Sequence, residues 1–146
     1  MQRNTMVAAL LALVFSGCAG DGPGDVAPGG EYAAIQAEIF NPSCISSSCH
    51  SSSTRAGGLS LEANESYAQL VGVTPANPTA AARGLLLVAL GDVAASFLVS
   101  KVDGSLEPGE GSLMPIGAQP LTPDEIGLIE IWIENGARRD PDPGER

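Results

Sequence analysis

Residues 44–50 read CISSSCH, in which Cys44 and Cys49 are separated by four residues and His50 follows the second cysteine directly. The chain holds one other cysteine, Cys18, and no other histidine. Two thiols beside an imidazole suit a disulfide, a metal ion or a covalently attached metal-containing group. What this heptapeptide binds is therefore the first question that the sequence raises.

A thioether far along the chain adds to this set, because Met114 is the only methionine beyond residue 6. Two thiols, an adjacent imidazole and a distant thioether are together what one covalently attached haem requires. The thiols of Cys44 and Cys49 add to the two vinyl groups, and the imidazole of His50 becomes the proximal iron ligand. The soft sulfur of Met114, as the distal ligand, favours Fe(II) and raises the reduction potential. The sequence therefore predicts one haem c held by these four residues.

Other uses of the same residues remain open. In an exported domain, Cys44 and Cys49 could form a disulfide across a short serine-rich loop, with His50 as a solvated surface residue. A structural zinc site would need a carboxylate in addition to the two cysteines and the histidine. A blue copper site is disfavoured, because it needs two histidines and one cysteine.

The N-terminal residues have the pattern of an export signal. Arg3 is the only charge before an apolar run over residues 6–15, which is half of the roughly 20 residues that a membrane-spanning helix needs. The next residues, Phe15-Ser16-Gly17-Cys18, resemble the lipobox of bacterial lipoproteins, in which cleavage leaves the cysteine as the lipidated N-terminus. We therefore expect a signal peptide at residues 1–17 and a lipid on Cys18, with an ordinary signal peptide as the alternative.

These signals predict the organisation of the rest of the chain. Residues 18–30 are rich in Gly and Pro and are expected to form a flexible, lipid-anchored tether. The haem domain is expected over residues 31–140, followed by a disordered tail at residues 141–146. We expect the protein in the bacterial cell envelope, facing the periplasm or the exterior, with the lipid as its only membrane contact.

Helical spacing of apolar residues begins at Glu31, and Asn41-Pro42 is expected to end that helix. Shorter structured pieces are expected over Ser66–Val71 and Asp92–Val102. Val73–Gly84 is rich in Ala, Pro and Thr and is predicted to be a surface loop. The apolar run 85–90 fits either a helix or a strand.

The strongest helix signal is the last one. Thr122 is an N-cap with Pro123 at the first helical position, and its spacing from Glu125 is that of a capping box. Gly136 stands where a glycine commonly ends a helix. The stripe that would face the core is formed by Ile126, Ile129 and Ile133, with Trp132 beside it.

Charge and composition limit the partners. The chain has 7 Lys and Arg against 17 Asp and Glu, a formal net charge of −10, which argues against binding nucleic acid. Cleavage after residue 17 would remove Arg3 and bring the formal charge to −11. Aromatic residues make up only 4% of the chain, so a bound haem would supply apolar bulk that the core otherwise lacks. A protein partner with a basic docking patch fits this charge.

Three segments of the chain resemble small monohaem c-type cytochromes with a Cys-x4-Cys-His attachment site, found in bacterial lipoproteins. The segments are FNPSCISSSCHSSSTRAGGLSL, GDVAASFLVSKV and LMPIGAQPLTPDEIGLIEIWIENGA. The resemblance implies an all-α fold around one haem, with a Met-Pro loop carrying Met114 and a C-terminal helix that crosses the first. It implies one-electron transfer between redox proteins and no enzyme activity. The residues between the cysteines are four here, where the commoner site has two.

The same resemblance implies further roles. A backbone carbonyl after the attachment site accepts the N–H of the proximal histidine, and Gly57 is the nearest candidate by spacing. Arg55 is a candidate partner for a haem propionate, although a solvated loop position is the simpler interpretation. Trp132 and Phe97 are expected in the core more than on the porphyrin. The alternatives are a peroxidase or gas sensor with an open sixth position, and a disulfide-stapled lipoprotein that binds a partner without a cofactor.

Overall fold

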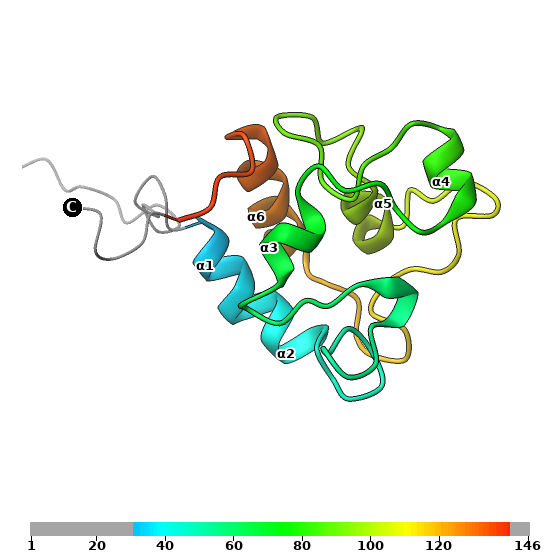
Figure 1. Ribbon diagram of the computed structural model, residues 1–146. Coiled ribbons are helices and arrows are strands. Elements are labelled where there is room, and N and C mark those ends of the chain that lie inside the picture. The colour runs from blue at the N-terminus through cyan, green and yellow to red at the C-terminus, as the bar shows by residue number, and fades with distance from the viewer. Residues whose placement is uncertain (1–30, 141–146) are drawn as a thin grey trace, which may run out of the picture.

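The computed structural model describes residues 31–140, which form short helices joined by long loops (Figure 1). The expected signal peptide, tether, tail and Cys18 lie outside the described residues. Within residues 31–140 there is no strand, only isolated bridges such as that between Val71 and Val88, so the all-α expectation is confirmed at this level. The helical elements in chain order are α1 (Glu31–Ile35), the π-helix η1 (Gln36–Phe40), α2 (Asn41–Ser43), the 3-10 turn η2 (Ala56–Gly58), α3 (Ser66–Leu70), α4 (Pro78–Ala82), α5 (Phe97–Asp103) and α6 (Pro123–Glu134).

The first three elements form one continuous helix that ends at Ser43, past the stop expected at Asn41-Pro42. The expectation that Asn41-Pro42 ends the helix was wrong, because η1 is a wider turn in which the N–H of Asn41 donates to the carbonyl of Gln36. Proline normally breaks a helix by removing an N–H and by crowding the carbonyl four residues earlier, and a π-turn changes this spacing. The chain leaves the helix at Cys44, whose backbone N–H still donates to the Phe40 carbonyl at 2.9 Å.

Helix α6 has the ends that its sequence predicts. The Oγ1 of Thr122 accepts from the backbone N–H of Glu125 at 3.3 Å, and the Glu125 carboxylate accepts from the N–H of Thr122 at 2.7 Å. The helix stops at Asn135, and Gly136 follows with a φ of 91°, which glycine adopts without strain. The capping-box prediction is confirmed.

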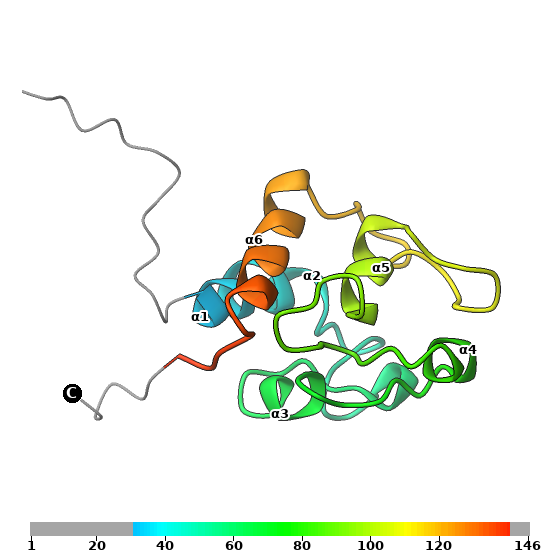
Figure 2. The same cartoon turned by 90° about the horizontal axis from the view of Figure 1, so that it is seen from above.

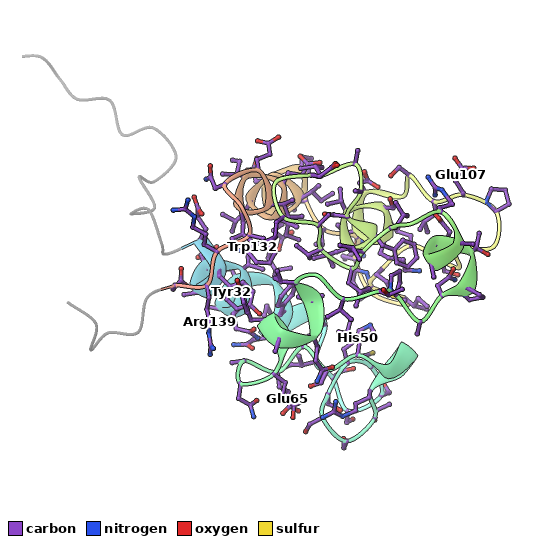
Figure 3. The ribbon with its side chains drawn as sticks, turned by 45° about the horizontal axis from the view of Figure 1, so that its top comes forward. Tyr32, His50, Glu65, Glu107, Trp132 and Arg139 are labelled. Carbon is purple, nitrogen blue, oxygen red and sulfur yellow. The ribbon has the colours of Figure 1, made fainter. Side chains whose placement is uncertain are left out.

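The core lies where α6 packs against α1 on one side and α5 on the other (Figure 2). Trp132 of α6 is fully buried, and its ring centroid is 5.1 Å from that of Tyr32 of α1; Figure 3 shows the two side chains together. The indole N–H of Trp132 donates to the Arg138 carbonyl at 2.8 Å, so the one polar atom of this ring is satisfied. Trp132 is therefore a core residue, as expected.

Residues 73–84 are not simply a surface loop, because they contain α4. The Oδ1 of Asn77 accepts from the N–H of Ala80 at 2.9 Å and Pro78 occupies the first turn, so this helix begins as α6 does. The run 85–90 forms isolated bridges rather than a strand. Helix α3 lies within the expected segment Ser66–Val71, and α5 covers the second half of Asp92–Val102 and runs one residue past it. None of the described helices is both long enough and apolar enough to cross a membrane.

Candidate functional site

A cavity of about 560 Å³ lies between the first helix, the loop after it, α5 and the loop that leads to α6. Its volume is within the range of sites that bind small molecules and cofactors, about 300–1,000 Å³. The walls are largely apolar and include Ile39, Phe40, Leu61, Leu98, Val102 and Leu121. A largely apolar cavity of this size can receive a largely apolar ligand.

Three of the predicted haem residues line this cavity. Cys44, His50 and Met114 are all part of its wall, although Met114 lies more than sixty residues beyond the other two in sequence. Cys49 is not part of the wall, and Cys18 lies outside the described residues. The fold thus brings one thiol, the imidazole and the thioether to one cavity, and leaves the second thiol beside it.

His50 is held by hydrogen bonds at three points. Its backbone N–H donates to the Cys44 carbonyl at 3.0 Å, and its carbonyl accepts from the N–H of Leu61 at 2.8 Å. Its ring Nδ1 lies 3.3 Å from the carbonyl oxygen of Leu59. Because a carbonyl can only accept, this contact places the ring proton on Nδ1 and leaves the lone pair on Nε2 in the neutral imidazole.

The expected acceptor for the His50 ring was Gly57, and the structure places Leu59 there instead. Gly57 lies in η2 with a φ of 64° and lines the cavity. That turn reverses the chain, so that the extended residue after it presents its carbonyl to the imidazole. Counting residues in the sequence could not reveal this reversal, because it depends on the left-handed backbone at Arg55 and Gly57.

The two thiols of residues 44–50 have different surroundings, and the structure does not join them in a disulfide. Burial raises the pKa of Cys44 to about 11, with a smaller contribution from the nearby thiol of Cys49. Cys49 accepts a hydrogen bond from the Oγ of Ser46 at 3.0 Å, and this contact, together with one to Ser48, lowers its pKa. Cys44 is thus a protonated, half-buried thiol at neutral pH, whereas Cys49 is the readier nucleophile.

Met114 lies near the middle of an irregular loop over residues 104–122. Its backbone N–H donates to the Lys101 carbonyl of α5 at 2.7 Å, and its peptide bond to Pro115 is cis. The residues that flank Met114-Pro115 are Leu113 and Ile116, and both are apolar and exposed. The thioether is therefore carried at the cavity wall by a loop that is tied to a helix through its backbone.

A polar cluster in the same wall was not foreseen from the sequence. The carboxylate of Glu110 is fully buried and pairs with Arg83 at 2.5 Å. It also accepts from the backbone N–H of Glu107 at 2.9 Å, which with Arg83 lowers the pKa of Glu110. The ammonium of Lys101 donates to the carbonyls of Glu110 and Ser112. No local pattern signals this cluster, because its members come from different elements.

Two secondary expectations can also be compared with the structure. Arg55 forms an ion pair with Glu65 at 2.7 Å on the surface and does not line the cavity. Phe97 is buried and lines the cavity, so it belongs to the core and to the site at once.

Among residues 31–140, no three Cys, His, Asp or Glu side chains gather as a metal-ion site would require. Comparison of the whole chain with models of known protein families, with curated proteins and with solved structures finds no match.

Proposed function

We propose that the chain carries one haem c in this cavity and serves as a one-electron carrier. The observation that carries the proposal is the contact between His50 and Leu59, because it leaves Nε2 free to bind a metal from the wall of an apolar cavity. The size of the cavity, the thiol of Cys44 and the thioether of Met114 fit the same group.

The cysteines would attach the haem by addition of each S–H across one vinyl C=C bond. Each addition forms one C–S and one C–H bond, so it consumes no oxidant and needs both thiols reduced. Cys44 is already in the cavity wall, and the exposed loop of residues 46–48 would have to turn Cys49 inward. The four residues between the cysteines give the loop the freedom for this turn.

The remaining residues would bind and tune the iron. The Nε2 of His50 would be the proximal ligand, and the sulfur of Met114 the distal one. When bound, the haem supplies an iron that accepts and releases one electron between Fe(III) and Fe(II). The apolar walls exclude water, and exclusion of water together with a thioether ligand favours the ferrous form.

The charge of the proposed carrier indicates protein partners with basic patches, and its N-terminus indicates a membrane anchor. With a formal charge of −11 once residues 1–17 are removed, it would meet redox proteins through their basic patches. A lipid on Cys18 would hold it at a membrane of the bacterial cell envelope, and residues 18–30 would let the domain move away from the surface.

A redox titration tests this function. The full chain, made together with a cytochrome maturation system, should be reduced reversibly by one electron, and the oxidised form should show the weak near-infrared absorption of methionine-ligated ferric haem. Met114→Ala should remove that absorption, lower the potential and admit carbon monoxide. A wild type that already binds carbon monoxide rapidly, and behaves like Met114→Ala, would instead indicate a gas sensor or a peroxidase. A protein without haem would overturn the proposal altogether.

A further inference from the structure

The loop over residues 106–114 forms one wall of the cavity and ends in Met114, yet it has no regular secondary structure. Such a segment keeps one conformation only when contacts outside it compensate the loss of chain entropy. The structure shows these contacts on two sides, from α5 and from α4.

Lys101 of α5 holds the second half of the loop. Its ammonium donates to the carbonyls of Glu110, at 3.2 Å, and Ser112, at 2.6 Å. Its own carbonyl accepts the backbone N–H of Met114 at 2.7 Å. One residue therefore ties three positions of the loop to a helix, and its side chain also lines the cavity.

Glu110 anchors the middle of the loop. Its carboxylate is buried and accepts from Arg83 at 2.5 Å and from the N–H of Glu107 at 2.9 Å. A buried carboxylate is costly unless it is paired and hydrogen bonded, and an apolar side chain would fill the same place at less cost. Apolar contacts have no preferred direction, whereas the ion pair with Arg83, just after α4, fixes Glu110 at one position.

The N-terminus of α4 adds a second contact on that side. The Nδ2 of Asn77 donates to the Gly109 carbonyl at 3.0 Å. A Cβ at Gly109 would lie 2.7 Å from the Oγ1 of Thr79, so the loop approaches α4 as closely as glycine allows. The loop is thus held against two helices at once.

We propose that Lys101 and Glu110 are positioning residues that hold the Met114 loop in the arrangement in which its sulfur can bind the haem iron. This inference rests on the proposed function, since it assigns these residues to ligation by Met114. Without the contacts of Lys101 and Glu110, the loop would lose chain entropy each time Met114 bound the iron. Ligation would weaken most in the ferric form, because a soft sulfur prefers ferrous iron.

The test uses the haem-loaded full chain with Lys101→Leu, which keeps an apolar side chain but removes the ammonium and introduces no new ligand. The near-infrared absorption of the oxidised protein should be lost or reduced, and carbon monoxide should bind the reduced protein about tenfold faster, as expected for the loss of about two partly exposed hydrogen bonds. The amide of Met114 should exchange its hydrogen faster. Lys101→Arg, which restores a cationic donor, should recover the absorption.

Two further variants keep this test decisive. Glu110→Gln has nearly the same volume and should weaken the absorption in the same direction, which covers the case in which Lys101→Leu does not fold. Glu134→Gln makes the same change as Glu110→Gln at an exposed position of α6 outside the cavity wall, and should leave absorption and carbon monoxide binding as in wild type.

The outcomes separate the two proposals. Unchanged absorption, carbon monoxide binding and amide exchange in Lys101→Leu and Glu110→Gln, with a methionine-ligated wild type, would overturn the positioning role alone. A shift in potential with the absorption intact would also overturn it, because Lys101 would then act on the charge of the haem and not on Met114. A wild type without covalent haem would overturn the proposed function.

Discussion

The ring Nδ1 of His50 lies 3.3 Å from the carbonyl oxygen of Leu59, nine residues further along the chain. The carbonyl fixes both the tautomer and the orientation of the only imidazole in the protein. Because the backbone of His50 is also bonded to Cys44 and Leu61, the ring has little freedom to turn away from the cavity. The imidazole of His50 is thus held in the wall of a cavity that a thiol and a thioether also line.

His50→Gly should leave haem attached through the cysteines but without its proximal ligand. We expect the absorption spectrum to change to that of a five-coordinate or water-ligated haem. Imidazole added to the solution should restore the wild-type spectrum, because removal of the side chain leaves room for it at the cavity wall. A spectrum that does not differ between His50→Gly and wild type would show that His50 is not an iron ligand.

The two thiols should react at different rates in the reduced, haem-free chain. Burial raises the pKa of Cys44 to about 11, and hydrogen bonds from Ser46 and Ser48 lower that of Cys49. Because the thiolate is the nucleophile, iodoacetamide at pH 8 should modify Cys49 more than about tenfold faster than Cys44. The difference should shrink as the pH rises towards the pKa of Cys44. Peptide mapping by mass spectrometry measures both rates, and equal rates at pH 8 would contradict the arrangement.

As a control for this difference, Ser46→Ala should slow modification of Cys49 and leave Cys44 unaffected. The serine donates directly to the Cys49 sulfur at 3.0 Å and so stabilises the thiolate.

Local signals in the sequence were sufficient for α6, where a cap, a proline and a terminal glycine lie within a few residues of one another. The same cap-and-proline signal at Asn77-Pro78 marks α4, and was overlooked because the surrounding residues resemble a loop. The end of the first helix does not follow from Pro42 alone, because the π-turn before it accommodates the proline within the helix.

The site was predictable to the extent that its chemistry is rare in this chain. One histidine, one distant methionine and a pair of cysteines could be selected by type alone, and three of these four residues line the cavity. The cluster of Arg83, Lys101 and Glu110 could not be, since charged residues are common and only the tertiary fold brings these three together.

Thr122→Ala should destabilise the haem-loaded protein by about 1 kcal/mol, because it removes the N-cap of α6. In thermal unfolding followed by circular dichroism, this corresponds to a fall in Tm of roughly 4 °C for a domain of this size. Thr74→Ala, at an exposed position outside any helix, is the matched control and should change Tm little. A fall no larger than that of the control would mean that the capping box contributes no stability.

Reduction by a cationic electron donor should be fast at low salt and slow down as ionic strength rises. The chain carries a formal charge of −10, and at 0.1 M salt charges more than about 10 Å apart are largely screened. Stopped-flow rates with a cationic and an anionic donor should therefore change in opposite directions with salt. Rates that do not respond to salt would rule out charge-steered docking.

The most direct test of the central claim is the intact mass of the denatured protein made with a cytochrome maturation system. We expect one haem to remain attached after denaturation and chromatography, with both cysteines of residues 44–50 consumed, and no attachment in the Cys44→Ala/Cys49→Ala variant. A chain without haem, lighter than the reduced protein by a pair of hydrogen atoms and linked between Cys44 and Cys49, would contradict the account.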